Sequence, residues 1–218
     1  MKDTPEIEIK RKFKWIFLSA LFLFLGLFAF QQIGLSTSIA KEILSYLICT
    51  DNLPPEKILD GVYILGGNQD SLKAKYETIA KLYAQGRCKE ISILSRQGIT
   101  EYNNALGRNL TNDEWSLEIF EGLGVSKKDV QPLKIEPGFF GTYTEAKWVS
   151  RVAEKNGWKN LLLITSLHHT KRVKKSFTCF LNGKNVNLYV MASKHTVGIL
   201  ELLSEFFKLQ FYQIFLLS

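Results

Sequence analysis

Five short apolar runs alternate with segments of helical length, and this alternation constrains the fold more than any other feature of the sequence. The runs lie at 62–65, 91–94, 130–135, 161–165 and 186–190. The intervening segments predict helices over about 71–85, 113–123, 143–156 and 168–181, with a long polar connection over 96–112. Strands that are apolar throughout are typical of a parallel sheet buried on both faces. Because parallel crossovers are right-handed, we expect a three-layer, doubly wound, mainly parallel α/β fold of the Rossmann-like type.

An uncharged apolar segment precedes this domain. From Trp15 to about Leu35 it offers roughly the 20 residues that a helix needs to span a bilayer. A run of four basic residues comes just before it: Lys10, Arg11, Lys12 and Lys14. The positive-inside rule then places the amino terminus in the cytoplasm and the following domain outside. We therefore predict a cytoplasmic tail over 1–14 and a single-pass transmembrane anchor over 15–35. The protein would lie in the inner membrane, with its domain on the periplasmic or extracellular side.

A cleaved signal peptide is the alternative to this anchor. Residues 38–40 (Ser-Ile-Ala) have the small side chains of a cleavage site. The apolar segment is longer than an ordinary signal core, which favours an uncleaved anchor. The domain is exported under either interpretation.

The segments that flank the α/β domain are amphipathic. Residues 36–56 carry apolar side chains at helical spacing and predict a stalk, which Pro54 and Pro55 interrupt. The α/β domain then occupies 57–195. Residues 196–218 are strongly apolar but contain Glu201, Glu205 and Lys208, so we expect an amphipathic helix and not a second span. This helix would either pack on the sheet or lie partly in the membrane interface.

The net charge of +7 raises the question of nucleic acid. Much of the excess lies in two short basic runs, at 10–14 and 171–175, without the interleaved aromatic residues of a nucleic-acid module. Anionic lipid headgroups attract such runs equally well, so we expect the bilayer and not nucleic acid as a partner. The three cysteines and three histidines lack the spacing of metal ligands, so we expect no metal and no cofactor.

Polar residues gather where the predicted strands end. In an open parallel sheet, ligands bind beyond the carboxyl ends of the strands. These positions hold Gly66, Gly67, Asn68, Ser95, Glu136 and Ser166, with His169 and Arg172 just beyond. No single residue is diagnostic, but four strands deliver polar groups to one edge. We therefore predict a ligand site there, with Asn68, Ser95 and Ser166 contacting the ligand.

His169 and Arg172 lie three residues apart in the first turn of a predicted helix and share one face. Arg172 could hold an anion through two parallel hydrogen bonds, and His169 could act as general acid or base. The alternative is a basic surface turn beside lipid. Gly66 and Gly67 could cradle a phosphate with their backbone N–H groups, or they could simply form a tight turn.

Two carboxylates are candidates to assist His169. Glu145 follows Thr142 by three residues, which fits a helix capping box as well as a catalytic role. Glu136 ends the third strand, where a solvated carboxylate needs no function. The sequence leaves both alternatives open.

The motifs together resemble the domain of unknown function 218 family over residues 58–192. The matching strings are DGVYILGG at 60–67, ISILS at 91–95, GTYTEA at 141–146 after Glu136, and LITSLHHTKR at 163–172. The resemblance implies a Rossmann-like fold, an amino-terminal anchor and a link to bacterial envelope or cell-wall biogenesis. It also implies a pocket lined by Gly66, Gly67, Glu136, Thr142, Glu145, Ser166, His169 and Arg172.

Three positions depart from the family pattern. Arg96-Gln97-Gly98 replaces a Ser-Gly-Gly-like turn, and Ala146 stands where many members have asparagine. An arginine common in the first helix is replaced by Lys73 or Lys75. These departures put a shared substrate in doubt.

The sequence supports functional hypotheses of different classes. The first is an enzyme, a hydrolase or transferase, acting on an anionic envelope precursor that is phosphorylated or lipid-linked. The second is a binding module that holds a nucleotide-like or anionic ligand without changing it. The third is a structural partner of envelope-biogenesis proteins in a membrane assembly.

Overall fold

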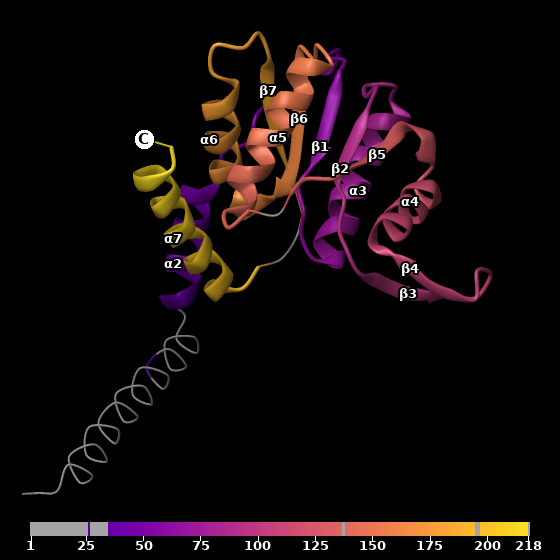
Figure 1. The fold of residues 1–218 in the computed structure, drawn as a ribbon. Helices are drawn as coiled ribbons and strands as arrows, with labels where there is room; N and C mark the ends of the chain where they lie inside the picture. Colours follow the sequence, from indigo (N-terminus) through magenta and orange to yellow (C-terminus); the bar gives the residue numbers. More distant parts are fainter. Residues whose placement is uncertain (1–25, 27–34, 137, 195–196, 218) are drawn as a thin grey trace, which may run out of the picture. The chain divides into compact units, whose positions relative to one another are not determined.

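The computed structural model describes residues 26, 35–136, 138–194 and 197–217 (Figure 1). The chain divides between Ser45 and Tyr46 into two units, within helix α2 (Leu35–Leu47). Nearly all of the predicted anchor at 15–35 lies outside the described residues. Among those residues, no helix has both the length and the apolar character needed to cross a membrane.

The second unit is built around a parallel sheet, as the apolar runs predict. In its described residues the strands are β1 (Gly61–Ile64), β2 (Ile91–Leu94), β5 (Val130–Leu133), β6 (Asn160–Ser166) and β7 (Asn187–Ser193). They are all parallel and lie in the order β5-β2-β1-β6-β7. This arrangement confirms the Rossmann-like α/β prediction. The chain moves outward from β1 through β2 to β5 and returns at β6, so the order reverses beside β1. Such a reversal opens a crevice at the carboxyl ends of the strands.

Helices cover both faces of the sheet (Figure 1). Helices α3 (Gln69–Ala84) and α4 (Asn112–Gly122) pack on one face, and α5 (Gly141–Lys155) and α6 (Thr170–Leu181) pack on the other. Side chains of a strand point alternately to opposite faces. Val62 and Ile64 of β1 therefore join the cluster under α3 and α4, whereas Tyr63 joins the cluster under α5 and α6. This alternation decides which β1 side chain can meet α5.

A hairpin occupies the segment that the sequence predicts as a long polar connection. Strands β3 (Ile99–Asn103) and β4 (Arg108–Thr111) pair antiparallel and form a separate small sheet. Of its apolar residues, Ile99 and Tyr102 are exposed and Leu110 is buried, so the hairpin lacks the regular apolar alternation that reveals a strand in a sequence. Thr111 then caps α4, and Glu114 completes a capping box.

The predicted stalk is helical for a shorter stretch than expected, because α2 ends at Leu47. The next residues are hydrogen-bonded to α6 and to the edge strand β7. The N–H of Cys49 donates to Thr170 Oγ1 over 2.9 Å. Asp51 is hydrogen-bonded to Val190 in both directions: its N–H donates to the carbonyl of Val190 and its carboxylate accepts from the N–H of Val190, each over 2.9 Å. These bonds offer the backbone a better partner than a further helical turn.

The chain closes with helix α7 (Ile199–Phe215), in agreement with the predicted amphipathic helix. Its inner face buries Leu202, Leu209 and Tyr212. Two short 3-10 helices precede other elements: η1 (Lys127–Asp129) before β5 and η2 (Leu167–His169) before α6. The turn η2 places His169 as the residue that precedes α6.

The contact between Gly61 and Trp158 gives a test of the core. A Cβ atom at Gly61 would lie 2.5 Å from the Trp158 ring, which is buried. We expect Gly61→Ala to lower the free energy of unfolding by about 1–3 kcal/mol, because the ring must move out of a packed site. Urea denaturation of the full chain in detergent, followed by circular dichroism, measures the loss.

Gly122→Ala is the matched control. Nothing lies within 4 Å of a Cβ atom at this helical residue. Its stability should change by less than about 1 kcal/mol. Equal stability for the two variants would contradict this account of the Gly61 contact.

Candidate functional site

Glu145 lies at the centre of the predicted site. It stands in the second turn of α5, and its Oε2 accepts a hydrogen bond from the Tyr63 hydroxyl over 2.7 Å. The capping-box interpretation of Glu145 is wrong. The helix begins at Gly141 with Phe140 as its N-cap, so Thr142 is already inside the first turn. The Glu145 carboxylate therefore does not cap its own helix and is bound by Tyr63 of β1 instead.

The surroundings of Glu145 change its acidity. Burial raises its pKa, and this effect outweighs the hydrogen bonds from Tyr63 and from the N–H of Gly66 and the charges of Lys75 and Arg172, all of which lower it. The net result is a pKa above the ordinary 4.5. A carboxyl group of this kind can exchange a proton closer to neutral pH than a solvated one.

Lys75 brings a positive charge to the same edge from the other face of the sheet. It is buried on α3, and its Nζ donates to the carbonyls of Leu65 over 3.0 Å and Gly66 over 2.7 Å. Burial lowers its pKa to about 8, although the charge of Glu145 opposes this shift. Of the two lysines considered for the family's arginine, Lys75 is the one at the site. Lys73 is exposed and lies over the Trp115 ring.

The glycine pair lets Lys75 reach the strand end. A Cβ atom at Gly67 would lie 2.3 Å from Ser71 Oγ and 3.0 Å from Lys75 Nζ. Glycine is therefore required at 67 by this close approach of α3. The N–H of the neighbouring Gly66 is directed toward the Glu145 carboxylate. These contacts give the pair a structural role in the turn.

Arg172 has a different partner from the one expected. Its Nε donates to Glu205 Oε1 over 2.5 Å and its Nη2 to Oε2 over 3.0 Å, so the two parallel bonds predicted for a ligand are made to α7. Nη1 donates to Thr142 Oγ1 over 2.5 Å. The group is buried, and Glu205 raises the pKa of Arg172 above its ordinary value in spite of that burial. Arg172 therefore joins α5, α6 and α7.

His169 is held by the same carboxylate. Its Nδ1 lies 2.7 Å from Glu205 Oε2. Burial alone would raise the pKa of Glu205, but the hydrogen bonds from His169 and Arg172 reverse the effect and lower this pKa to about 2. His169 lines neither of the two cavities described below, and its role as general acid or base stays a prediction.

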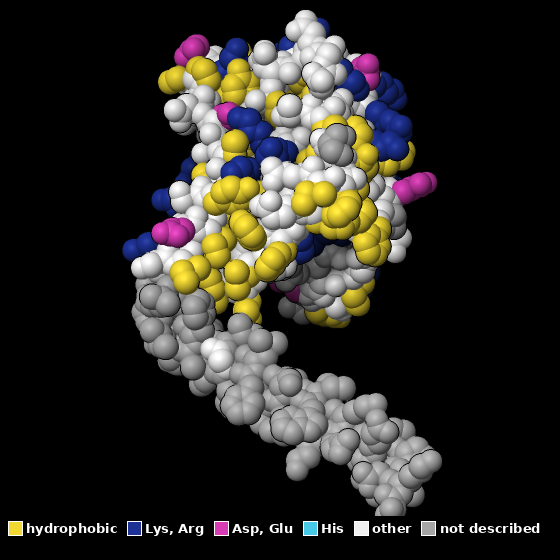
Figure 2. Space-filling model, turned by 90° about the vertical axis from the view of Figure 1, so that its left-hand side faces the viewer, with side chains coloured by type: hydrophobic (Ala, Val, Ile, Leu, Met, Phe, Trp, Pro, Cys, Tyr) yellow, Lys and Arg dark blue, Asp and Glu magenta, His cyan; other side chains and the backbone are white. Residues whose placement is uncertain are grey.

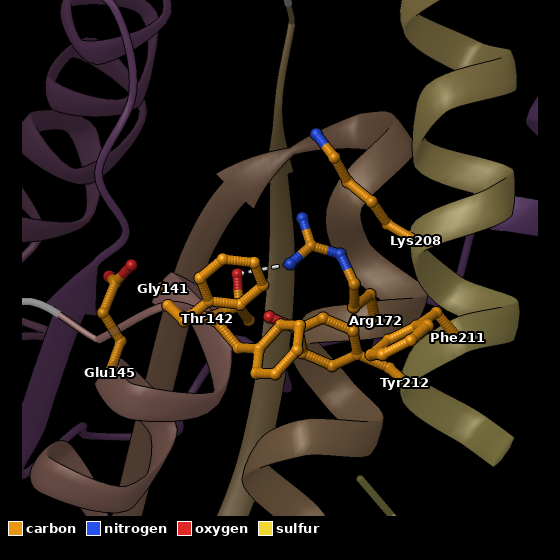
Figure 3. A pocket seen from close by; sticks show the side chains of 9 residues that line it. Gly141, Thr142, Glu145, Arg172, Lys208, Phe211 and Tyr212 are labelled. Atoms are coloured by element: carbon orange, nitrogen blue, oxygen red, sulfur yellow. Dashed lines mark hydrogen bonds between the residues drawn. The ribbon is translucent and has the colours of Figure 1, made fainter. Parts of the chain in front are cut away.

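Two cavities flank the start of α5 within the described part of the chain. The first, of about 600 Å³, is here called the aromatic cavity (Figure 3). It lies between α5 and α7, with Arg172 and Lys208 at one end and Glu145 at the other. Its lining residues are Phe139, Phe140, Gly141, Thr142, Glu145, Arg172, Lys208, Phe211 and Tyr212. Phe140 and Phe211 stack with their ring centres 5.3 Å apart.

The second cavity, of about 770 Å³, is here called the polar cavity. It lies between α5 and the ends of β2 and β5. Its lining residues are Leu94, Ser95, Arg96, Gln97, Lys134, Ile135, Glu136, Gly138, Gly141, Thr144 and Glu145. Gly141 and Glu145 belong to both cavities, so one carboxylate faces the two spaces.

The polar cavity is suited to an anion. The first turn of α5 contains no acidic residue, and its N-cap Phe140 provides no side-chain hydrogen bond. The N–H groups at the start of such a helix attract negative charge. Lys134 and Arg96 add positive charge. Arg96 Nη1 donates to the carbonyl of Gly67 over 3.3 Å, while its Nη2 is buried without a hydrogen-bond partner among the described residues.

The other predicted residues fall into two groups. Ser95 and the exposed Glu136 line the polar cavity, and Ser95 Oγ donates to Asp113 over 2.5 Å. Thr142 lines the aromatic cavity. Asn68 caps α3 by accepting from the N–H of Ser71, and Ser166 is buried at the end of β6. Asn68 and Ser166 line neither cavity, so no ligand contact is assigned to them.

Sequence reasoning missed Tyr63, Lys134 and Glu205, and it named Lys75 and Arg96 only as departures from the family pattern. Tyr63 looks like an ordinary strand residue, and Glu205 lies 33 residues from Arg172. Arg96 lies two positions after the end of β2, next to Ser95. A charged residue just beyond the end of an apolar strand is the signal that was available for Arg96.

The Glu205 pair predicts a pH-dependent stability. Its folded pKa of about 2 lies below the ordinary 4.5. The contribution is therefore fully present above about pH 5 and is lost as the pH falls toward 2; the shift corresponds to about 3 kcal/mol. Glu205→Gln should lower the free energy of unfolding at pH 7 by about 3–5 kcal/mol, because Arg172 loses its buried counter-charge. Denaturant titrations from pH 7 to 2 should show the two proteins converging.

Glu154→Gln is the matched control, because Glu154 pairs with Lys184 at the exposed surface. Its effect should stay below about 1 kcal/mol. A constant difference between wild type and Glu205→Gln down to pH 2 would contradict the lowered pKa of Glu205.

Comparison with known proteins adds no relative. No family model matches the chain, and none of the curated proteins matches it. The likeness to the domain of unknown function 218 family therefore stays a prediction based on the motifs quoted above. The two cavities are the structural basis for any function inferred for the chain.

Proposed function

We propose that this chain is a membrane-anchored, exported protein of bacterial envelope biogenesis that binds and hydrolyses an anionic precursor, phosphorylated or lipid-linked. The observation that carries the proposal is the position of Glu145. This half-buried carboxyl group has a raised pKa and belongs to both cavities at the start of α5. A titratable carboxyl group beside an anion-attracting helix start combines a base with a binding site.

Binding of the anion is assigned to the polar cavity. The N–H groups at the start of α5, Arg96 and Lys134 would surround a phosphate or carboxylate there. The N–H groups of α5 and the Arg96 guanidinium, which donates to the carbonyl of Gly67, are held by the fold before the ligand arrives, as electrostatic stabilisation of a reacting group requires. The partner-free Nη2 of Arg96, among the described residues, supports a ligand contact.

Glu145 would act as the general base. It takes a proton from a water molecule, whose oxygen bonds to the phosphorus or carbonyl centre while the bond to the leaving group breaks. The leaving group takes a proton from solvent and Glu145 returns its proton to solvent, so the net reaction is hydrolysis by one water molecule. The Tyr63 hydroxyl fixes one carboxylate oxygen, and the Lys75 charge favours the ionised form of Glu145. A base placed in this way contributes typically about 10²–10⁴-fold to the rate.

The envelope assignment depends on the sequence. The apolar segment at 15–35, the basic residues before it and the resemblance to envelope proteins support an anchored, exported domain. Lipid bilayer and an anionic ligand are then the expected partners.

One observation favours a second candidate, a non-catalytic binding module. Arg172 and His169, which the sequence marks for chemistry, are both occupied by Glu205. A protein that only holds its ligand would have no need of a free acid or base at these positions. The two candidates differ in the behaviour of Glu145.

Glu145→Gln tests the catalytic role. The amide keeps the shape and can still accept from Tyr63, but it cannot take a proton. We expect turnover of a phosphorylated-sugar or lipid-phosphate substrate to fall by about 100-fold or more, with affinity changed by less than about tenfold. Product release and thermal shift are measured on the full chain in detergent.

The control for this substitution is Glu77→Gln, an exposed position on α3. It should leave both readouts unchanged. Binding by wild type without product from any substrate in the panel would favour the binding module. Unchanged turnover in Glu145→Gln would exclude Glu145 as the base.

Arg96→Ala and Lys134→Ala test the anion site. Each removes a positive charge from the polar cavity, and a charge-assisted hydrogen bond contributes about 1.5–3 kcal/mol. We therefore expect the dissociation constant of inorganic phosphate or a sugar phosphate to rise by about 10–100-fold in isothermal titration. Lys208→Ala, in the aromatic cavity, is the comparison. A larger loss in Lys208→Ala than in the other two would move the anion to the aromatic cavity.

A further inference from the structure

The outer face of α7 is apolar and uncovered. Its exposed large side chains recur at helical spacing and form one stripe, here called the α7 stripe: Leu200, Phe207, Phe211, Ile214 and Phe215. Phe207 and Phe215 are each about two-thirds exposed, at 66% and 65%. Figure 2, which views the side of the molecule that carries α7 in Figure 1, shows hydrophobic side chains gathered on this face. A contiguous apolar surface of this kind marks an interaction site.

The inner face of α7 is already packed, so the stripe is not left over from an incomplete core. Leu202, Leu209 and Tyr212 are buried, and Glu205 is paired with Arg172. A helix that is apolar on both sides needs a second apolar environment.

The loop before α5 extends the stripe. Phe139 is 95% exposed and packs edge-on against Phe140, with ring centres 4.8 Å apart. Phe140 in turn stacks on Phe211 of the stripe. These aromatic residues also line the aromatic cavity, so its mouth lies beside the exposed apolar surface.

The start of the second unit lies against the same helix. The Tyr46 ring is 5.5 Å from the Phe206 ring, and the Tyr46 hydroxyl accepts a hydrogen bond from Gln210 over 3.1 Å. Tyr46 lies eleven positions after Leu35, where the predicted anchor ends. These positions span about 17 Å as a helix and at most about 40 Å when extended. Chain length alone therefore keeps α7 near the bilayer that holds the anchor.

Positive charges border the apolar surface. Lys208 follows Phe207 on α7 and is exposed. Lys171 donates to the carbonyl of Tyr46 over 2.7 Å, and its Nζ lies 3.6 Å from the centre of the Tyr46 ring. Phenylalanine and leucine flanked by lysine are typical of a helix that lies in a membrane interface. Anionic headgroups would attract the bordering lysines.

We propose that the α7 stripe, together with Phe139, lies in the headgroup and acyl boundary of the membrane. This inference rests on the anchor in the proposed function and adds the orientation of the domain. The mouth of the aromatic cavity then opens at headgroup depth. A ligand with a hydrocarbon part reaches Glu145 from the membrane side, with its apolar end along Phe139 and Phe211.

Depth-dependent quenching tests the inference on the full chain in proteoliposomes of phosphatidylethanolamine and phosphatidylglycerol. The native Cys49, Cys88 and Cys179 are replaced by serine. Phe207→Cys and Ile214→Cys then each carry one environment-sensitive fluorophore. Because an interfacial helix buries its apolar face by about 5–10 Å, brominated acyl chains should remove about half or more of the fluorescence.

Leu123→Cys is the matched control. Leu123 is an exposed apolar residue at the end of α4, across the sheet from α5 and α6. Its fluorophore should lose less than about a tenth of its signal, since the opposite face stays in water. A fluorophore at Leu27→Cys, within the predicted anchor, reports on the anchor itself.

The outcomes separate the two proposals. Quenching at Leu27→Cys without quenching at 207 and 214 overturns the interfacial position of α7 and leaves the anchor intact. Absence of quenching at all three positions overturns both the orientation and the anchor in the proposed function. Protection of 207 and 214 from iodide without lipid quenching, with disulfide crosslinking between 207 positions, shows that a second copy covers the stripe and also overturns the inference.

Discussion

The buried ion pair between Arg172 and Glu205 is the interaction on which the carboxyl-end region of the sheet depends. Each of these charges would be costly to bury alone, and the two parallel hydrogen bonds offset that cost only while both partners are present. The third donor of Arg172 holds Thr142 at the start of α5. The pair thus fixes α7 relative to α5 and α6, and the aromatic cavity between α5 and α7 exists because of this arrangement. The carboxy-terminal helix is therefore part of the site.

The sheet supplies the second constraint. Alternation along β1 turns Tyr63 toward α5, so its hydroxyl reaches Glu145, while neighbouring residues face α3. Lys75 belongs to the other face and reaches the edge only past Gly67, where a side chain would collide with it. An acid from one helical layer and a cation from the opposite layer meet where β1 ends. This position beside the reversal of strand order is where open parallel sheets bind ligands.

The periodicity of apolar residues was sufficient to predict the fold, but it did not predict the hydrogen bonds and ion pairs at the site. The strand at 91–94 is predicted with its exact bounds, because a buried parallel strand is a continuous apolar run. The β3–β4 hairpin escapes the same reasoning because Leu110 is the one fully buried side chain in its two strands. The pattern Thr142-x-x-Glu145 suggests a capping box. Helix α5 begins at Gly141, however, so Thr142 lies inside the helix and is not its N-cap. The partners of Arg172 and Glu145 come from distant segments, and a single sequence contains no signal for such long-range contacts.

The two carboxyl groups near Arg172, those of Glu205 and Glu145, have opposite environments. This difference explains why the pKa of Glu145 is raised although a buried arginine lies near it. Glu205 takes two of the hydrogen bonds of Arg172, and its pKa falls to about 2. Glu145 receives only the charge of Arg172 at a distance, the weakest of its stabilising influences, so burial dominates and raises its pKa. When the environments of two carboxyl groups shift their pKa values in opposite directions, the two groups differ in role: one is a permanent counter-ion and the other can exchange protons. If Arg172 instead bound Glu145, the pKa of Glu145 would fall and its capacity as a base would be lost. The pairing of Arg172 with Glu205 therefore leaves burial as the dominant influence on the pKa of Glu145.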